Sequence, residues 1–173
     1  MSAMSTITAS ALISAAPTPA EWRAAMGYFP TGVTIVTSWR DGAPAGATIN
    51  AICSVSLEPP MLLICLGAGN TIREPVEKSG VFGVNILGVD GEAVAARFGA
   101  PPEAGRFETC GYDAVEGGAP QLRAAAVFID CALEDVHAAG DHFIMIGRGV
   151  RTRHVSTARP LLYHRGGFPK TWG

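Results

Sequence analysis

The pattern of apolar and polar positions predicts one helix near the N-terminus and a change of structure directly after it. Residues 18–21 (Thr-Pro-Ala-Glu) form a capping box with proline at the first helical position. Trp22, Met26 and Phe29 then follow at helical spacing, and Pro30 stops the pattern. The chain should therefore begin its folded part with a single amphipathic helix.

Beyond Pro30 the apolar residues alternate or run continuously, which is typical of strands. The predicted strands are residues 33–39, 47–56, 61–66, 81–87, 127–134, 142–150 and 161–164. Residues 61–66 are apolar at every position, so this strand should be buried on both faces. Asp41-Gly42 and Gly140-Asp141 are typical of tight turns between paired strands.

Two short helices and one long loop are predicted between these strands. Residues 71–79 are helical up to Gly80, with an irregular backbone because Pro75 lacks a donor. Asp90 can cap a helix that runs to Phe98. Residues 99–125 have no period and predict a loop with a covering or functional role. Short strands without regular strand–helix–strand alternation favour a mainly β fold, an antiparallel barrel or sandwich.

Composition bounds the domain organisation and the class of protein. Of 173 residues only 16% are charged, against a usual value of about 25%, and the net charge is −2. These values exclude a disordered chain and give no sign of nucleic-acid binding, and no apolar run is long enough to span a membrane. Residues 1–17 are small and uncharged and predict a flexible leader, and residues 18–173 predict one domain. The low charge leaves open where the chain buries its excess of apolar surface.

The four cysteines indicate reduced, structural thiols. No two of Cys53, Cys65, Cys110 and Cys131 have the spacing of a metal-binding or redox pair, and we expect no metal site. All but Cys110 lie in apolar stretches, where cysteine behaves as a small hydrophobic residue. Reduced thiols make the cytoplasm the expected location.

Common catalytic motifs are absent. Gly67-Ala68-Gly69 resembles the start of a dinucleotide-binding fingerprint, but Ile72 stands where the third glycine is required. The sequence also lacks the Gly-x-Ser-x-Gly motif of hydrolases and the His-Glu-x-x-His motif of metalloproteases. The chain therefore shows no sign of hydrolytic or metal-dependent chemistry.

Polar residues on a strand near the core give the first candidate binding site. Residues 47–56 combine small and hydroxyl side chains, among them Thr48, Asn50 and Ser54. Buried polar groups need partners, so such a strand faces either a bound planar heteroaromatic ligand or, alternatively, solvent at a sheet edge.

Three weaker signals stand elsewhere in the chain. Asn70 and Thr71 open a helical segment and could hold a phosphate or simply cap the helix. Asp141 and His142 place two ionisable groups at a turn. Five of the eleven arginines fall between residues 148 and 165, where they could bind phosphate or line a solvated strand face.

Eight short motifs in a fixed order resemble the short-chain flavin reductase family, the reductase components of two-component flavin-dependent monooxygenases. They are residues 29–33 (FPTGV), 48–51 (TINA), 54–60 (SVSLEPP), 79–82 (SGVF), 84–87 (VNIL), 97–98 (RF), 140–142 (GDH) and 160–166 (PLLYHRG). The resemblance covers about residues 20–168. It implies an FMN-binding split barrel of Greek-key type with six or seven antiparallel strands and two or three short helices, assembled as a homodimer.

The same resemblance implies an activity: hydride transfer from C4 of NADH or NADPH to N5 of free FMN or FAD, with the reduced flavin supplied to a separate monooxygenase. Two alternatives share the fold, a non-enzymatic FMN-binding electron carrier and an oxidase of the pyridoxamine-phosphate type. The Gly140-Asp141-His142 motif favours the reductase, because a pure binding protein needs no nicotinamide site.

The resemblance also implies positions for the ligands. The flavin ring and ribityl chain would contact Thr48, Ile49, Asn50, Ala51, Ser54, Val55, Ser56 and Leu57. The flavin phosphate would lie near Asn70 and Thr71, with Ser79, Gly80, Phe82 and Asn85 close by. The nicotinamide side would hold His142, the one residue expected to position the reacting groups, together with Tyr163, His164, Arg165 and Gly166.

Overall fold

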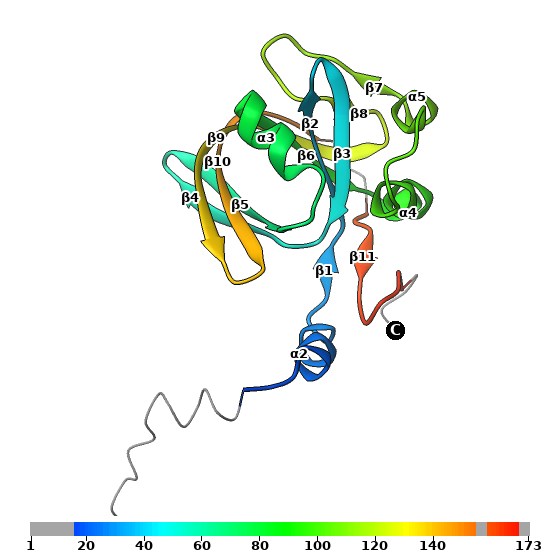
Figure 1. Ribbon diagram of the computed structural model, residues 1–173. Helices are drawn as coiled ribbons and strands as arrows, with labels where there is room; N and C mark the ends of the chain where they lie inside the picture. The colour runs from blue at the N-terminus through cyan, green and yellow to red at the C-terminus, as the bar shows by residue number, and fades with distance from the viewer. Residues whose placement is uncertain (1–15, 155–158, 170–173) are drawn as a thin grey trace, which may run out of the picture.

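A seven-stranded antiparallel sheet forms the centre of the computed structural model, which describes residues 16–154 and 159–169 (Figure 1). In spatial order its strands are β3 (Ala43–Ile49), β2 (Thr34–Arg40), β6 (Val81–Leu87), β9 (Ala125–Ala139), β10 (His142–His154), β5 (Pro60–Gly67) and β4 (Ile52–Leu57). Two small pairs, β1 (Thr31–Gly32) with β11 (Leu162–Tyr163) and β7 (Tyr112–Asp113) with β8 (Gln121–Leu122), lie outside it. The helices are α2 (Pro19–Met26), α3 (Arg73–Ser79), α4 (Glu92–Gly99) and α5 (Arg106–Cys110), with a 3₁₀ turn at Val89–Gly91. The predicted mainly β, antiparallel fold class is confirmed.

The chain connection between the two edge strands bends the sheet into a barrel. Only Asn50 and Ala51 separate β3 from β4, although these strands lie at opposite edges of the sheet. Three Cα–Cα steps span about 11 Å at most, so the two edges must meet at this end. At the other end the edges are not paired, and α3 packs there against β2 and β6. The prediction of one strand over residues 47–56 is therefore wrong, because the chain leaves one edge and begins the other within it.

The periodic strands were placed correctly by their pattern, but two are longer than predicted. The hairpin of β9 and β10 turns at Gly140, whose φ of 62° is in the left-handed region. On β5 the prediction of two buried faces is only half right. Leu62, Ile64 and Leu66 are buried in the barrel, whereas Met61, Leu63 and Cys65 on the opposite face are half-exposed in the single chain.

The helices depart from prediction for identifiable local reasons. Helix α3 is regular because Pro75 lies in its first turn, where backbone N–H groups have no partner within the helix. Asp90 does not cap α4, since the 3₁₀ turn intervenes and Gly91 is the cap. The capping box of α2 is confirmed, with the Thr18 N–H donating to Glu21 Oε2 at 2.8 Å.

The long loop predicted for residues 99–125 contains α5, β7 and β8 and forms a cover over the sheet. Phe107 and Leu122 are buried beneath it, with Phe98 of α4. This outer core is separate from the barrel interior, where Phe82, Ile64 and Met145 pack together. The covering role expected for the segment is thus confirmed.

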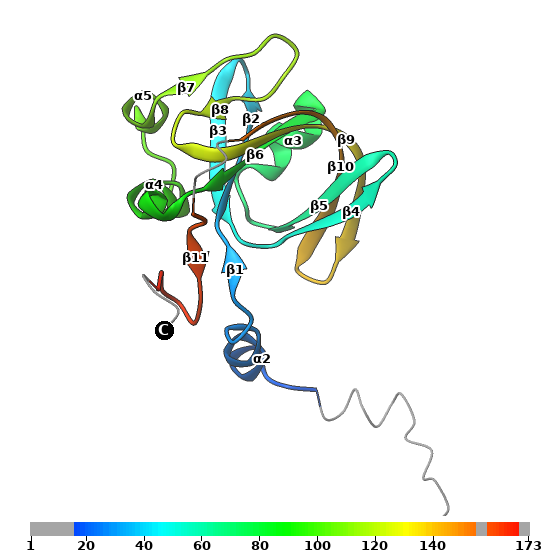
Figure 2. The ribbon, with the colours of Figure 1, turned by 180° about the vertical axis from the view of Figure 1, so that it is seen from behind.

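Helix α2 stands apart from the barrel, beyond β1 and β11 (Figures 1 and 2). None of its residues is buried, and Trp22 and Met26 on the apolar stripe are 59% and 51% exposed. The amphipathic pattern is therefore present, but its apolar side has no partner within the described part of the chain. The flexible leader was predicted for residues 1–17, of which residues 1–15 lie outside the described residues.

Candidate functional site

A groove at the foot of the barrel brings together two predicted segments that are more than 100 residues apart in the sequence. It consists of two adjoining hollows, of about 400 and 690 Å³, which both include Asn50 and Tyr163. Thr48, Ile49, Ala95 and Phe168 line the smaller one. Tyr28, Arg165 and Gly166 line the larger one, beside α2. Mostly apolar walls with a few polar groups are typical of small-molecule sites of this size.

The end of β3 supplies the polar part of this groove. The Thr48 hydroxyl donates to the Ala95 carbonyl at 2.7 Å, which ties the strand end to α4. Ile49 is buried, but Asn50 is exposed at the point where the chain leaves the sheet. The Ala51 carbonyl accepts from the Cys65 N–H at 3.0 Å, which fixes the connection to β5. The connection is held at both ends, so Asn50 is presented on a rigid support.

The C-terminal segment forms the other wall of the groove. Tyr163 lies on β11 with its ring centroid 5.6 Å from that of Phe168. The Arg165 N–H donates to the Gly27 carbonyl at 3.1 Å, and its guanidinium lies 4.6 Å from the centre of the Tyr28 ring. His164 makes an edge contact with the same Tyr28 ring. These contacts attach the end of α2 to the segment in which the nicotinamide residues are expected.

His142 lies at the tip of the β9–β10 hairpin, opposite Gly67 at the end of β5. Its Nδ1 is 2.7 Å from Asp141 Oδ1, and about half of the imidazole side chain is exposed. The hydrogen bond from His142 and its charge hold the pKa of Asp141 below the usual range. A carboxylate on Nδ1 fixes the ring orientation and leaves Nε2 directed elsewhere.

Asn70 and Thr71 lie in a different hollow, of about 460 Å³, together with Arg40 and Arg73. Asn70 Oδ1 accepts from the Ile72 N–H at 3.1 Å, so its carbonyl oxygen already caps the turn before α3. Arg40 donates to the Thr71 carbonyl. The expected phosphate-binding residues therefore lie beside Arg73, their neighbour in sequence, and Arg40, which comes from a distant segment of the chain.

The remaining predicted residues fall into three groups, of which two lie at the surface or partly buried. Ser54, Val55, Ser56 and Leu57 lie along the outer strand β4, where Leu57 is 85% exposed. At the top of the barrel the Ser79 hydroxyl pairs with the Ser38 hydroxyl at 2.8 Å, next to Gly80.

Phe82 and Asn85 are completely buried in the protein interior. Phe82 packs in the barrel core, and the Asn85 amide donates to the Ile35 carbonyl and accepts from the Leu122 N–H. Neither side chain offers an atom to a ligand, so the structure gives both a packing role. The sequence has no signal that separates such residues from neighbouring binding residues.

The C-terminal arginines mostly serve the fold. Arg151 pairs with the buried Asp130, and Arg148 pairs with Glu134 at 2.6 Å. With the Gln121 amide in its hydrogen-bonding orientation, Gln121 accepts from Arg153 at 2.6 Å. The phosphate-binding interpretation of this cluster therefore lacks support at these three positions.

The cysteines are free thiols in different environments. Burial raises the pKa of the Cys131 thiol to about 12 and also raises that of Cys65, which keeps both protonated. Cys53 is exposed on β4 in the single chain. Its apolar neighbours in sequence alternate between the two faces of the strand, and Cys53 falls on the outer one.

The described residues show neither a metal site nor a membrane-spanning helix. Among the described residues, no cluster of three or more His, Cys, Asp or Glu side chains is arranged to hold a metal ion. None of the helices in residues 16–154 and 159–169 is long and apolar enough to cross a membrane.

Comparison with known proteins decides the family. The sequence pattern of the "flavin reductase like domain" matches residues 26–171, which include nearly all the segments described above. The chain belongs to the flavin reductase-like family. The function of this family is the NAD(P)H-dependent reduction of flavin, as the reductase component of two-component monooxygenases.

Individual relatives agree with the family assignment. The chain is 36% identical over 166 residues to the reductase subunit HsaB of a flavin-dependent monooxygenase from Rhodococcus jostii, covering 95% of this chain and 85% of that protein. It is 38% identical over 149 residues to a flavin reductase (NADH) from Kitasatospora aureofaciens, covering 84% and 78% of the two chains. The solved structure of the NADH:FAD oxidoreductase SgcE6 from Streptomyces globisporus superposes with a TM-score of 0.84 at 31% identity, over 91% of this chain and 96% of that one.

Proposed function

We propose that this flavin reductase-like chain reduces free flavin with NADH and supplies the reduced flavin to a separate monooxygenase. The observation that carries the proposal is the groove in which Thr48, Ile49 and Asn50 meet Tyr163, Arg165 and Gly166. Family motifs that are more than 100 residues apart in the sequence form this one surface. The relatives named above as NADH-dependent enzymes and as a monooxygenase subunit support the donor and the partner.

The site residues fit a flavin because an apolar groove with a few polar groups suits a planar ring, and no acid–base pair is required. The bound flavin and nicotinamide supply the redox chemistry themselves. The chain has to hold the two rings at stacking distance and exclude water. Asn50 offers an exposed amide on a fixed support, and the Asp141–His142 pair offers an oriented imidazole. We assign His142 a positioning role.

His142→Ala is expected to raise the KM for NADH about fivefold to tenfold while changing kcat by less than about threefold, because it removes binding rather than a reacting group. His137→Ala is the matched control, since His137 lies on the same hairpin and also pairs with a carboxylate, Asp135, at 3.1 Å. Steady-state kinetics with NADH varied at saturating flavin measures both constants. An unchanged KM in His142→Ala, or the same change in the control, would contradict the assignment.

The activity itself is tested by following NADH absorbance with excess FMN, FAD or riboflavin. We expect oxidation well above the rate without enzyme, and NADH to be used better than NADPH. The electron-carrier alternative instead requires tightly bound FMN with no turnover. Absence of turnover with every pair of substrates would refute the proposal.

For the flavin we propose FAD as the preferred substrate, supported by the solved relative that is an NADH:FAD oxidoreductase. The same assay, with FMN and FAD titrated separately, measures the preference. The four free thiols support a cytoplasmic location, because disulfides are rare in that compartment.

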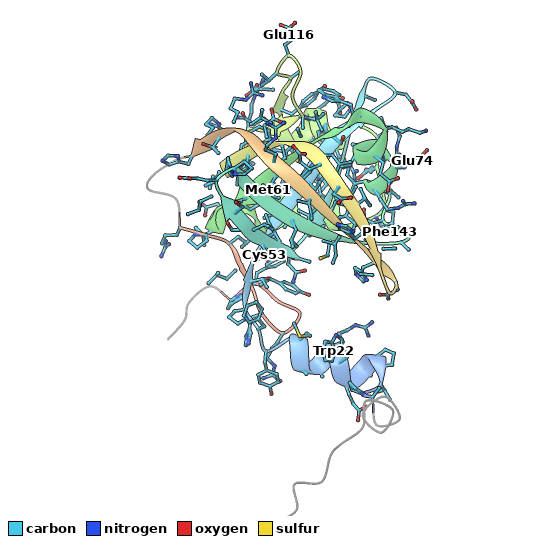
Figure 3. All side chains as sticks on the ribbon, turned by 90° about the vertical axis from the view of Figure 1, so that its left-hand side faces the viewer. Trp22, Cys53, Met61, Glu74, Glu116 and Phe143 are labelled. Carbon is cyan, nitrogen blue, oxygen red and sulfur yellow. The ribbon has the colours of Figure 1, made fainter. Side chains whose placement is uncertain are left out.

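We propose that the chain works as a homodimer through the outer face of β5, β10 and β4. Strand register places Cys65 beside Ile144, and Leu63 between Ile146 and Cys53. These side chains are half-exposed or exposed in the single chain and form one apolar face, on which Cys53 and Met61 are labelled in Figure 3. Contiguous apolar surface of this kind marks an interface. The exposed apolar stripe of α2 offers further surface for a second copy.

Ile146→Lys is expected to convert the dimer to a monomer, because it places a charge in the centre of this face. Ala114→Lys, in the exposed loop before β8, is the control with the same added charge. Sedimentation equilibrium of the three proteins at one concentration compares their masses. A monomeric wild-type chain, or a dimeric Ile146→Lys protein, would show that the interface lies elsewhere or does not form.

A further inference from the structure

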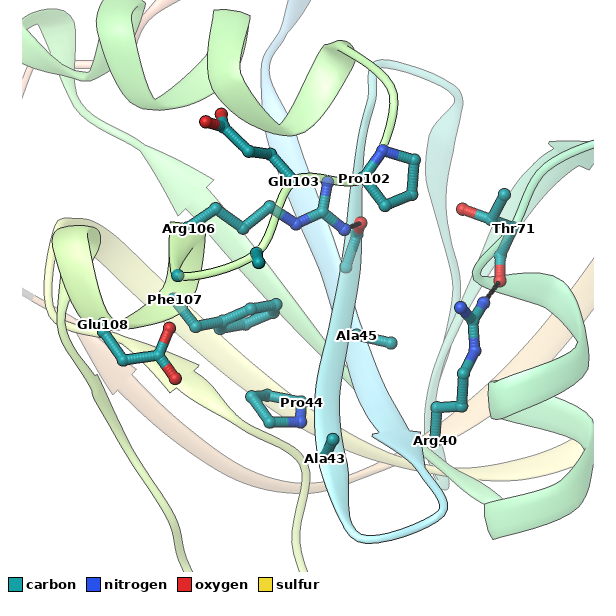
Figure 4. A pocket seen from close by; sticks show the side chains of 13 residues that line it. Arg40, Ala43, Pro44, Ala45, Thr71, Pro102, Glu103, Arg106, Phe107 and Glu108 are labelled. Carbon is teal, nitrogen blue, oxygen red and sulfur yellow. Dashed lines mark hydrogen bonds between the residues drawn. The ribbon is translucent and has the colours of Figure 1, made fainter.

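A further hollow, of about 300 Å³, lies along β3, away from the residues that line the groove at the foot of the barrel (Figure 4). β3 pairs only with β2, so its other edge is unpaired. The walls are residues 43–46 of β3, the segment 102–108 before and within α5, and Arg40 with Thr71. None of these residues belongs to a family motif quoted above, and only Thr71 was expected near a ligand, as a phosphate candidate.

Arg106 is a buried cation in this hollow. It is only 7% exposed, and its Nη2 donates to the Gly46 carbonyl at 2.6 Å. Its guanidinium lies 4.8 Å from the centre of the Phe98 ring. Within the described residues no carboxylate pairs with it, although a buried charge normally has a counter-ion. Burial and the charge of Arg40 both lower the pKa of Arg106, which means that the site favours an added negative charge.

Arg40 joins this hollow to the one that contains Asn70. It donates to the Thr71 carbonyl, and Arg40 and Thr71 line both hollows. In the second hollow Arg73 is already paired with Glu77 at 2.7 Å. Arg40, by contrast, makes no ion pair within the described part of the chain. Two cations without a paired carboxylate therefore face one continuous depression.

The carboxylates nearby do not neutralise these arginines. Glu103 and Glu108 line the hollow but are exposed, and neither forms an ion pair with Arg106 among the described residues. Figure 4 shows the Glu103 carboxylate directed away from the Arg106 guanidinium. Glu74, near Arg40, is paired with Lys78 at 2.6 Å. Within the described residues, the positive charges of Arg40 and Arg106 are therefore not paired with a carboxylate.

We propose that this hollow binds the diphosphate of an adenosine-diphosphate moiety, with Arg40 and Arg106 donating to its phosphate oxygens. Guanidinium groups suit phosphate because they donate two parallel hydrogen bonds. The inference rests on the proposed function, since FAD and NADH both carry adenosine diphosphate whereas FMN does not. The hollow continues from Asn70 and Thr71, where the FMN phosphate is expected, so a longer flavin would reach it.

Direct binding tests the site without turnover. Isothermal titration of the full chain with ADP, AMP and inorganic phosphate should show ADP binding best. Arg40→Gln should weaken ADP binding about tenfold, as the loss of one charge-assisted contact predicts. Arg123→Gln is the control, because Arg123 is an exposed arginine paired with Asp113 outside the hollow. Equal ADP binding by wild type and Arg40→Gln, or no ADP binding by wild type, would overturn the proposal.

Arg106 is tested separately with Arg106→Lys. This variant keeps the positive charge but loses the planar guanidinium, which can donate two parallel hydrogen bonds. We expect ADP binding to weaken about tenfold in this variant as well. Thermal unfolding of the variant establishes that it is folded before the titration. If folded Arg106→Lys binds ADP like wild type, Arg106 is a packing residue and the two-arginine site is wrong.

Steady-state kinetics then shows whether the bound adenosine diphosphate belongs to FAD or to NADH. FAD is compared with FMN, and NADH with reduced nicotinamide mononucleotide, because each pair differs only by the adenylate group. A rise in KM for FAD but not FMN in Arg40→Gln assigns the site to the flavin, and a rise for NADH but not the mononucleotide assigns it to the donor. Equal changes within both pairs would overturn the proposal. Failure of the proposed function looks different: no flavin would be reduced by wild type, whatever its ADP binding.

Discussion

Gly147→Ala is expected to destabilise the barrel by about 3 kcal/mol, the upper part of the range for overpacking a core. A Cβ at this position would lie 2.3 Å from Phe82 Cζ and 3.0 Å from Cys131 Cβ. Phe82 and Cys131 are both completely buried, so neither can move into solvent to make room. The whole β6–β9–β10 contact would have to shift to accept one methyl group.

Gly149→Ala is the matched control two residues further along β10. There a Cβ would meet nothing closer than the Pro60 carbonyl at 3.7 Å, an ordinary contact distance. We expect the free energy of unfolding of this variant to lie within about 0.5 kcal/mol of the wild-type value. Urea unfolding at one protein concentration compares the three chains. Equal urea midpoints for Gly147→Ala and Gly149→Ala would show that the core accommodates a methyl group at Gly147.

Asn85→Ala is expected to lower the free energy of unfolding by about 2–4 kcal/mol, because it leaves buried backbone groups without hydrogen-bond partners. The Asn85 amide donates at 3.0 Å to both the Ile35 carbonyl and the Thr37 hydroxyl, and it accepts from the Leu122 N–H at 2.8 Å. These bonds fasten the segment around β8 onto β2 and β6. Their loss removes hydrogen bonds in a place that water does not reach.

Asn70→Ala provides the comparison for stability. The Asn70 side chain accepts one hydrogen bond, from the Ile72 N–H, at a partly exposed turn. We expect Asn70→Ala to lower the free energy of unfolding by about 1 kcal/mol, as the loss of a helix cap does. Differential scanning calorimetry of both variants measures the difference. An Asn85→Ala protein as stable as wild type, with a raised KM for flavin, would instead place Asn85 in the binding site.

The predicted binding residues show that a sequence motif does not separate ligand-binding residues from buried core residues. Thr48, Asn50 and Tyr163 could be selected from motifs, and the structure brings them into one groove. Asn85 and Phe82 belong to the same motifs but are buried. A motif marks that a residue type is needed at a position, and does not distinguish contact with a ligand from contact with the core.

The sequence by itself determined the elements with strong local signals. The capping box at Thr18, the left-handed Gly80 after α3 and the hairpin turn at Gly140 all depend on residues within a few positions, so local chemistry decides them. The β-branched and alternating apolar residues of β2 and β9 likewise predicted strands from local pattern alone. These features together were sufficient to predict an antiparallel β fold.

Only the tertiary structure decided how distant segments meet. The break at Asn50, which divides the predicted strand 47–56, follows from closure of the barrel, and no local signal marks it. The meeting of Arg40 with Arg106 depends on the path of the segment after α4, which has no periodic pattern. Local propensities act over a few residues, whereas sheet closure and the sites it creates depend on packing between residues far apart in the chain.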